Sequence, residues 1–287
     1  MKHLFHSIFF CVFAVLVSCS SNDEPEYPIF MQPSSITTTD IKGGNQSIEY
    51  DDYGKVIGWT LKPNYPNDAS IYTAQYSYQN NNTIHIVSEE SWLNQKRCYD
   101  ETIQLVNGRA SKSEGTFIYT EDGNAVLKKT DRLEFEYDPS NHLTVVKHAE
   151  VVGIGENIKD GVLDKAWAWE NYLIWEDDNL KEFQDYQGKA SVYQTTKYEY
   201  SIYAVSYPIV MPMVINNAHH LPLFMQGVFG SHSVNLVKST SVLDNKGNIT
   251  MSCQYSYEFD QARIIEYTET LSCYPTPITY NVTWIER

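Results

Sequence analysis

Basic residues are scarce in this chain, and long apolar runs are missing. The 287 residues include 21 Lys and Arg against 36 Asp and Glu, a formal net charge of -15. A surface that binds nucleic acid needs clustered Lys and Arg to neutralise phosphates, and no such cluster occurs. After the leader, no segment approaches the ~18 apolar residues of a membrane-spanning helix. The sequence therefore excludes nucleic acid as a partner and predicts no transmembrane helix.

The sequence also lacks the short motifs of common enzymes. It contains no Gly-x-Ser-x-Gly elbow, His-Glu-x-x-His pair, Walker loop or dinucleotide fingerprint. No Cys-x-x-Cys zinc spacing is present either. Low Gly and Pro counts, 14 and 11, exclude collagen-like and low-complexity classes. We therefore expect a globular protein that is not an enzyme, with no catalytic residue, no metal and no cofactor.

The first 19 residues have the pattern of an export signal. Lys2 and His3 precede an apolar run from Leu4 to Val17, and Ser18 and Cys19 follow. The ending Leu-x-Ser-Cys resembles the lipobox of bacterial lipoproteins, which implies that Cys19 is acylated and becomes the mature N-terminus. Two or three acyl chains, at ~0.8 kcal/mol per buried CH₂, would hold a soluble domain on a membrane. An ordinary secretory signal that contains a Cys is the alternative.

Residues 20–40 are rich in Ser, Thr and Pro and are predicted to form a flexible tether. The tether begins with the acidic tract from Ser20 to Glu24, which resembles the signals that send Bacteroidetes lipoproteins to the outer face of the outer membrane. This resemblance implies an outer-membrane protein at the cell surface. A plain acidic linker, with the domain facing the periplasm, would look the same. Residues 41–287 are predicted to form a single domain.

From Gln46 onward, apolar and polar residues alternate. The enriched types, including 22 Tyr, suit a pleated and half-buried surface. Clear examples are Thr83 to Val87 and Arg132 to Tyr137. Such strands place one face on a core and the other toward water, as antiparallel sheets permit. The fold class is therefore predicted to be all-β, and the best helical candidate, Glu156 to Trp169, is short.

A loose repeat separates these strands. An apolar residue and an acid are followed by two variable residues, a Gly or Asn, and then an aliphatic residue. Copies begin at Tyr50, Tyr137 and Leu243, and a shorter variant runs from Trp175 to Leu180. The acid caps a turn, and Gly or Asn accepts the positive φ that reverses the chain. The repeat predicts a succession of hairpins.

These Tyr-Asp turns, together with the stretch Leu221 to Leu236, resemble an uncharacterised family of Bacteroidetes lipoproteins with a porin-like or super-sandwich fold. The likeness covers Gln46 to Glu286, although the turn at Phe259 to Ile264 lacks the expected Gly. It implies a large curved antiparallel sheet, like a half-barrel, and no established activity. A membrane pore is not expected, because the second face of each strand carries Glu, Gln, Asn and Lys where lipid would require apolar residues.

Three cysteines remain after the leader. Cys253 and Cys273 flank the hairpin centred near Arg263 at equal distances, so a cross-strand disulfide is geometrically possible in an oxidising compartment. The alternative is that they are free core residues, like Cys98.

The segment Tyr207 to Val237 is apolar, interrupted by Pro and poorly alternating, and it contains His219, His220 and His232. Adjacent His residues in an extended chain point to opposite faces, so we do not expect His219 and His220 to share one metal ion. The segment is expected to be buried and to cover an open face of the sheet. A lid over an apolar ligand cavity is the alternative.

Three tryptophans are the candidate binding residues: Trp167, Trp169 and Trp175. Exposed indole faces suit a pyranose ring, although cross-strand packing is the commoner role of such residues. The acid pairs Asp51–Asp52, Glu89–Glu90 and Asp177–Asp178 would support a hydrolase only across a cleft. The sequence thus predicts a non-catalytic binding protein for a glycan or an apolar, lipid-like ligand. A glycan hydrolase and a purely structural envelope component remain alternatives.

Overall fold

The computed structural model describes residues 31–40, 43–64, 70–154, 169–186, 191–204, 218–261, 263–274 and 276–286. The chain divides into two compact units, residues 1–30 and 31–287. The leader, Cys19 and the acidic tract lie outside the described residues, as does most of the predicted helix at Glu156 to Trp169. None of the helices in the described part is long and apolar enough to span a bilayer.

The second unit is all-β, as predicted. Its strands in chain order are β1 (Met31–Thr37), β2 (Gly44–Tyr50), β3 (Val56–Pro63), β4 (Ile71–Gln79), β5 (Thr83–Trp92), β6 (Gln95–Val106), β7 (Arg109–Glu121), β8 (Asn124–Tyr137), β9 (Leu143–Ile154), β10 (Trp169–Glu176), β11 (Asn179–Asp185), β12 (Gln194–Ala204), β13 (Asn235–Asp244), β14 (Ile249–Asp260), β15 (Arg263–Leu271) and β16 (Ile278–Glu286). Each strand pairs antiparallel with its neighbours in the chain, which confirms the predicted succession of hairpins.

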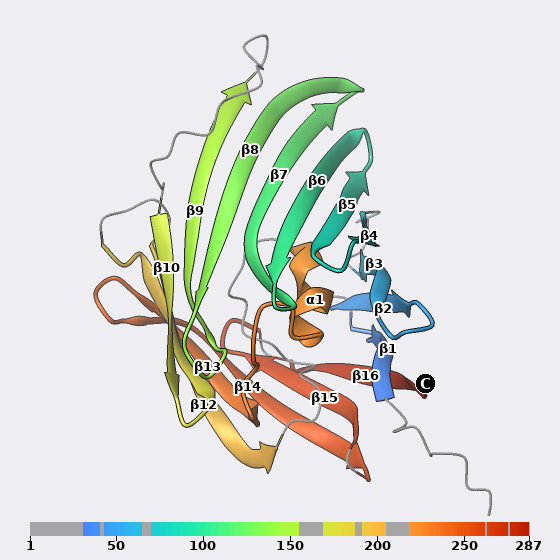
Figure 1. Ribbon diagram of the computed structural model, residues 1–287. Coiled ribbons are helices and arrows are strands. Elements are labelled where there is room, and N and C mark those ends of the chain that lie inside the picture. The colour runs from blue at the N-terminus through green and yellow to red at the C-terminus, as the bar shows by residue number, and fades with distance from the viewer. Residues whose placement is uncertain are drawn as a thin grey trace, which may run out of the picture. The chain divides into compact units, whose positions relative to one another are not determined.

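The sheet closes into a barrel, so the expected open, half-barrel-like sheet is wrong (Figure 1). Closure comes from β1, which pairs with β16 in a register that sets Ile36 opposite Val282. Period-two alternation shows which face of a strand is buried, but it does not show whether the last strand meets the first. Residues 31–37, assigned from sequence to the tether, supply the closing strand, so the barrel begins at Met31 rather than at residue 41.

The two faces of the barrel wall differ in polarity. On β5, for example, Ile84 and Ile86 are fully buried, while Val87 between the buried positions is exposed. Ion pairs join neighbouring strands on the wall, among them Lys96–Glu89 at 2.6 Å, Arg132–Glu114 at 2.9 Å and Lys197–Glu182 at 3.3 Å. The members of these three pairs are partly exposed. The apolar core therefore lies inside the barrel.

The connection between β12 and β13 fills one end of this core. Its described part contains the 3-10 turn η2 (Ala218–His220) and the short helix α1 (Leu221–Met225), which lies among the strands in Figure 1. Leu223, Met225 and Phe229 are almost completely buried in the core. We call residues 218–234 the plug. The predicted burial of this segment is thus confirmed for most residues from His219 to Ser233, and residues 207–217 lie outside the described part.

Hydrogen bonds join the plug to the hairpin turns at one end of the barrel, here called the plugged end. They are Gln226 Nε2 to Gly54 O (2.6 Å), Ala110 N to Val228 O (2.8 Å), Ser231 N to Asn141 O (2.8 Å) and Val234 N to Asp178 O (3.2 Å). The fit is close at Gly230, where φ is +90° and a Cβ would clash with Asn141 O. The plug is therefore held by backbone and side-chain groups of several turns.

A set of aromatic residues, here called the aromatic belt, lies just inside the plugged end. Near the end of each even-numbered strand except β6, a Tyr or Trp donates its O–H or N–H to a backbone carbonyl of the preceding strand. The pairs are Tyr50 to Pro33 (2.8 Å), Tyr78 to Val56 (2.9 Å), Tyr137 to Ala110 (2.8 Å), Trp175 to Leu143 (2.8 Å), Tyr200 to Leu180 (2.7 Å), Tyr257 to Val237 (2.6 Å) and Trp284 to Ile264 (2.8 Å). In β6 this place is taken by Leu105, which also packs on the core.

The belt and the sequence repeat overlap. In two copies the aromatic residue of the repeat, Tyr50 or Tyr137, belongs to the belt, and the acid that follows caps the turn. Asp51 Oδ1 accepts hydrogen bonds from the backbone N–H groups of Tyr53 (2.9 Å) and Lys55 (2.8 Å). Gly54 supplies the positive φ of +76° that the reversal needs. The repeat therefore combines a turn with a packing contact inside the barrel.

The strand register does not set the two candidate disulfide partners opposite each other. Cys253 on β14 pairs with Leu271, two residues before Cys273. Cys253 is buried, Cys273 is exposed, and both carry free thiols, as does Cys98. The disulfide between Cys253 and Cys273 stays a prediction.

Candidate functional site

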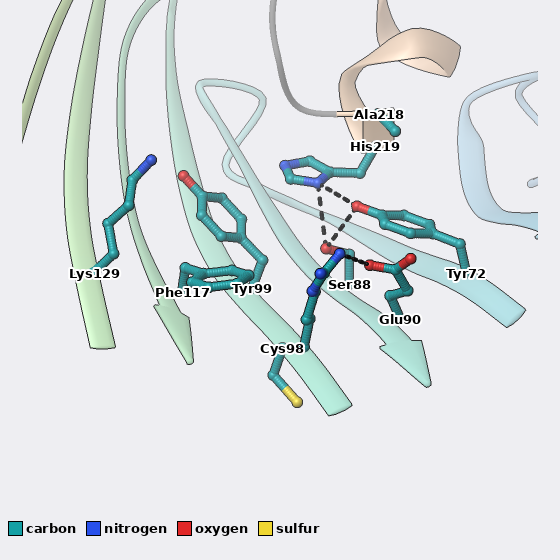
Figure 2. Close-up of a pocket in the computed structure, with 10 residues that line it drawn as sticks. Tyr72, Ser88, Glu90, Cys98, Tyr99, Phe117, Lys129, Ala218 and His219 are labelled. Carbon is teal, nitrogen blue, oxygen red and sulfur yellow. Dashed lines mark hydrogen bonds and ion pairs between the residues drawn. The ribbon is translucent and has the colours of Figure 1, made fainter. Parts of the chain in front are cut away.

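A pocket of about 340 Å³ lies against strands β4 to β8, with His219 of the plug beside it (Figure 2). It is lined by Tyr72, Ser88, Glu90, Arg97, Cys98, Tyr99, Phe117, Lys129, Ala218 and His219. Most of these residues lie in the halves of their strands that are remote from the plugged end, so we call this side the pocket end. The pocket volume is in the range of small-molecule binding sites.

Aromatic rings form one side of the pocket. The Tyr99 ring lies 4.9 Å from the His219 ring and 6.4 Å from the Phe117 ring, measured between centroids. Gly115 on β7 leaves room for Tyr99, because a Cβ at that position would lie 2.7 Å from the Tyr99 ring. The Tyr99 hydroxyl donates to Asp131 of β8. Tyr99 is therefore held on both sides, and it presents a ring next to His219.

The remaining wall is charged, and its cations already have partners. Arg97 Nη1 lies 2.9 Å from Glu90 Oε2, and the guanidinium group stacks 5.6 Å from the Trp92 ring. Lys129 Nζ lies 2.9 Å from Glu150 and 3.2 Å from Asp131. Burial lowers the pKa of Lys129, but the two carboxylates outweigh this effect and raise it. Both cations are therefore charged, and both are compensated.

His219 is positioned by two hydroxyl groups. Its Nδ1 lies 2.9 Å from the Tyr72 hydroxyl and 3.2 Å from Ser88 Oγ, and its backbone carbonyl accepts a hydrogen bond of 2.7 Å from Tyr76. Burial lowers the pKa of His219 below its ordinary value. Burial also raises the pKa of Tyr72 to about 12. Both groups are therefore neutral at pH 7 and can exchange hydrogen bonds with a polar ligand.

Behind His219 lies a carboxylate that is completely buried. Glu101 of β6 has no exposed surface, and its Oε2 lies 2.7 Å from Nε2 of both His219 and His220. Its Oε1 accepts a hydrogen bond from Ser113. Burial alone would raise the pKa of Glu101, but the two His residues lower it well below the usual range. Glu101 is therefore ionised inside the barrel.

The expectation that His219 and His220 do not share a metal ion rested on a wrong premise. It assumed an extended chain, whereas the two residues end the 3-10 turn η2, in which neighbouring side chains are ~120° apart and not opposite. Sequence reasoning also missed Glu101. Its position between the buried Tyr99 and Ile103 in the alternating pattern of β6 shows an acid on the apolar face of a strand. An acid at an apolar position of an alternating strand is therefore the signal in the sequence that points to Glu101.

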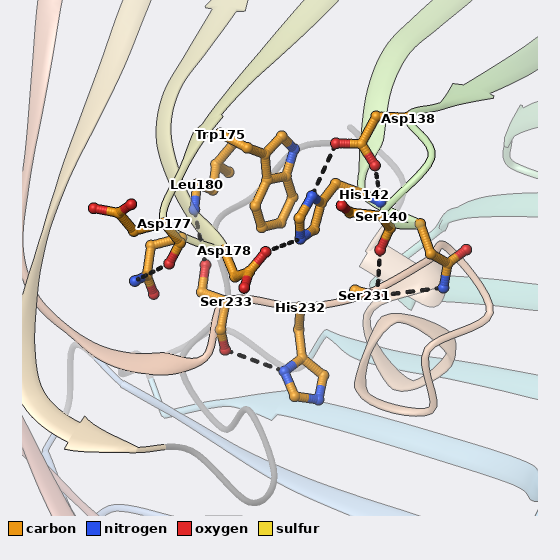
Figure 3. Close-up of polar contacts among 12 residues, drawn as sticks. Asp138, Ser140, His142, Trp175, Asp177, Asp178, Leu180, Ser231, His232 and Ser233 are labelled. Atoms are coloured by element: carbon orange, nitrogen blue, oxygen red, sulfur yellow. Dashed lines mark hydrogen bonds and ion pairs between the residues drawn. The ribbon is translucent and has the colours of Figure 1, made fainter. Parts of the chain in front are cut away.

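The candidate tryptophans are not brought together at the pocket. Trp167 lies outside the described residues. Trp169 is half-buried, with its ring edge-on to His148 at 3.8 Å. Trp175 is a belt residue whose ring stacks on His142 at 4.3 Å (Figure 3). The structure therefore gives Trp169 and Trp175 packing contacts inside the barrel, which was the alternative role weighed for them.

His142 belongs to a second polar cluster, which lies at the plugged end. Its Nδ1 lies 2.9 Å from Asp138 Oδ2 and its Nε2 lies 3.4 Å from Asp178 Oδ1, so it joins two hairpin turns (Figure 3). His232 of the plug donates to the backbone carbonyl of Ser233 at 3.2 Å. Asp138 and Asp178 are therefore linked through His142, which gives the acids of these two turns a structural role.

None of the paired acids places two carboxyl groups in the pocket. Glu90 lines it, but Glu89 forms its ion pair with Lys96, whose side chain is about half exposed at 47%. Consecutive residues of a strand point to opposite faces. The pair Asp51–Asp52 lies in a turn. Asp177 and Asp178 lie in another turn, both with positive φ.

Comparison with known proteins shows the fold. No protein-family model matches the chain, and no curated protein matches it. Similar solved structures include a porin-like protein from Bacteroides vulgatus (TM-score 0.55, 12% identity) and a porin-like protein from Bacteroides uniformis (TM-score 0.51, 11% identity). The alignments cover 88% of this chain in both cases, and 98% and 96% of those chains.

The chain has a porin-like β-barrel fold. This confirms the porin-like part of the predicted resemblance, while membership of a lipoprotein family stays a prediction. At 11–12% identity the likeness carries fold alone and assigns neither a ligand nor an activity.

Proposed function

We propose that this barrel is a binding protein that holds a small polar ligand, of the size of a mono- or disaccharide, in the pocket beside His219. The observation that carries the proposal is the pocket itself, about 340 Å³ in volume, which combines aromatic rings with hydrogen-bonding groups. Sugar-binding sites need both, since ring faces cover C–H groups while polar side chains satisfy hydroxyls.

The pocket lining favours a sugar over a lipid. Tyr99 and Phe117 offer rings, while the Tyr72 hydroxyl, Glu90 and Arg97 offer donors and acceptors. A lipid would leave these polar groups unsatisfied on binding, which costs ~1–3 kcal/mol for each buried group. Because both Arg97 and Lys129 already pair with carboxylates, the ligand that fits is uncharged. A neutral saccharide therefore suits this pocket best.

The lining does not support the alternative of a hydrolase that uses two carboxylates. Glu90 is the acid among the lining residues of the described part of the chain. Hydrolysis of a glycosidic bond by the common mechanisms needs a second carboxyl group ~5 to 9 Å from the first, across the substrate. Binding without turnover is the function that this lining supports.

The sugar proposal is tested by calorimetric titration of the purified full-length chain with a panel of neutral mono- and disaccharides. At least one should bind in the micromolar to millimolar range. Phe117→Ala and Arg97→Ala should each weaken that binding by tenfold or more. The matched control is Lys197→Ala, which removes a cation from a partly exposed ion pair remote from the pocket. Absence of binding across the panel, or equal loss in the control, refutes the proposal.

We further propose that the barrel is held on the outer membrane, at the cell surface, by acyl chains on Cys19. The lipobox-like sequence and the acidic tract after it support this location. A barrel with ion pairs on its wall and a plug in its interior does not suit a membrane pore, whose outer band must be apolar.

The anchor is tested by labelling cells with a palmitate analogue. Wild type should incorporate the label and Cys19→Ala should not. Cys11→Ala, which changes another cysteine of the leader, is the matched control and should be labelled like wild type. Surface exposure is then read from protease treatment of intact cells, and protection of the chain there would place the domain in the periplasm.

A further inference from the structure

Three metal-ligating side chains converge behind the pocket. One ligand atom from each of Glu101, His219 and His220 lies within 4.8 Å of the others, and all three residues are buried. We propose that these residues bind a divalent transition metal ion such as Zn²⁺. This inference does not depend on the saccharide proposal, because it concerns different atoms.

The donor set fits such an ion. Two imidazole nitrogens and one carboxylate oxygen are a common ligand set for Zn²⁺, with metal–ligand distances of ~2.0–2.2 Å. Nε2 of both His residues now lies 2.7 Å from Glu101 Oε2. In tetrahedral geometry the ligand atoms would be ~3.4 Å apart, so each Glu–His separation would lengthen by ~0.7 Å, and all three ligand atoms already lie within 4.8 Å of one another. The ion would thus replace two hydrogen bonds.

The charge of the cluster also calls for a cation. Glu101 is completely buried, and its ion-pair partners in the described part of the chain are the two His residues, with no Lys or Arg among them. A buried carboxylate is costly unless a positive charge compensates it. A divalent ion would add positive charge beside this buried carboxylate, at the point where the three ligand atoms meet.

The surrounding groups suit ligands of a metal. Ser113 holds the second carboxylate oxygen, and Tyr72 and Ser88 hydroxyls lie at hydrogen-bond distance from Nδ1 of His219. Such outer contacts orient metal ligands in known sites. Nδ1 of His220 is buried and has no hydrogen-bond partner among the described residues. Because no hydrogen bond to Nδ1 favours one tautomer of His220, Nδ1 is able to carry the ring proton while Nε2 binds the ion.

The ion has a path to this site. His219 lines the pocket, so it connects the buried cluster with the side from which a small solute enters. Glu101 and His220 lie deeper and are not part of the pocket lining. An ion that entered through the pocket would therefore meet His219 first and complete its coordination behind that residue.

The metal site is tested with Co²⁺ and Zn²⁺ on the purified full-length chain after treatment with a chelator. One equivalent of Co²⁺ should produce the visible absorption bands of a four- or five-coordinate site, and Zn²⁺ should displace it. Zn²⁺ should also raise the Tm. Absence of both the bands and the Tm shift in the wild-type chain overturns the proposal, whether or not any variant folds.

Variants identify the ligands. His220→Gln and Glu101→Gln, which keep side-chain volume, should each weaken Zn²⁺ binding by at least 100-fold. The matched control is His85→Ala, because His85 pairs with Asp100 at 2.8 Å but both are partly exposed. Retention of wild-type affinity in folded His220→Gln, or an equal loss in His85→Ala, would mean that the ion binds elsewhere and would overturn the proposal.

Discussion

Inward-facing side chains of the strands have different roles at the two ends of the barrel. At the plugged end, these positions carry the aromatic belt, whose O–H and N–H groups donate to backbone carbonyls. Core residues there pack around Leu223 and Phe229 of the plug. At the pocket end, the positions carry two ion pairs, Arg97–Glu90 and Lys129–Glu150, and leave a pocket of about 340 Å³. The comparison shows that one alternating register can build a filled core along part of a strand and a binding surface along the rest.

This division of labour predicts that damage to the plugged end lowers stability and that damage to the pocket end lowers binding. The largest effect is expected for Phe229→Ala. Phe229 is 1% exposed and packs on Phe135 and Phe224 with ring centroids 5.2 and 4.6 Å away. Loss of such a ring costs about 4 kcal/mol in the free energy of unfolding. Denaturant unfolding measures this loss, and Phe259→Ala, at a position 39% exposed, is the control that should change little.

The second prediction concerns a buried acid in the middle of β8, between the two ends of the barrel. Asp131 is 3% exposed. Burial raises its pKa, but His148, Lys129 and Tyr99 together lower it below the ordinary value. A lowered carboxyl pKa adds stability that is present at neutral pH and is lost as the pH falls below the ordinary Asp value of ~3.9 toward the folded-state pKa.

Asp131→Asn should therefore destabilise the barrel at pH 7 by about 3 kcal/mol, because it leaves buried partners without their acid. The difference from wild type should shrink as the pH is lowered from 5 to 3. Unfolding free energies measured across that range test the sign. A difference that grows toward low pH would show that Asp131 does not stabilise the native state through its charge.

A smaller loss is expected when a belt residue loses only its hydroxyl. Tyr137→Phe removes the hydrogen bond to Ala110 O and should cost about 1 kcal/mol, because the carbonyl is left without that donor. Saccharide binding should be unchanged, since the belt lies at the other end of the barrel. Tyr53→Phe is the matched control, because Tyr53 is 90% exposed, and its Tm should equal that of wild type. Equal Tm values for the two variants would mean that the hydrogen bond from Tyr137 does not contribute to stability.

The smallest effect should have the opposite sign. Burial raises the pKa of Glu269 above the ordinary Glu value. A raised carboxyl pKa means that stability falls as the pH rises from the unfolded-state value through the folded-state value. Glu269→Gln should therefore raise the Tm slightly at pH 7, by about 2 °C, and not at pH 4. A lower Tm at pH 7 would show that the ionised carboxylate has a partner that stabilises it.

Much of the barrel was predictable from local patterns. The repeat predicts the hairpins at Tyr50 and Tyr137, and the apolar composition of the segment Tyr207 to Val237 predicts its burial. The belt was not foreseen, because the hydrogen bond from Tyr137 to Ala110 joins two strands in a register that the repeat does not contain. Trp175 is a candidate binding residue on sequence because composition does not distinguish a packed indole from an exposed one.

The alternating strands from Gln46 onward and their hairpin turns were determined by the sequence alone, because alternation and turn chemistry act between residues a few positions apart. Tertiary structure decided the closure by β1 and β16 and the meeting of Glu101 with His219 and His220. The contacts of Glu101 with the two His residues join positions that are 118 and 119 apart in the chain. Their geometry depends on how strand register and a turn of the plug combine in space, and no local pattern encodes that combination.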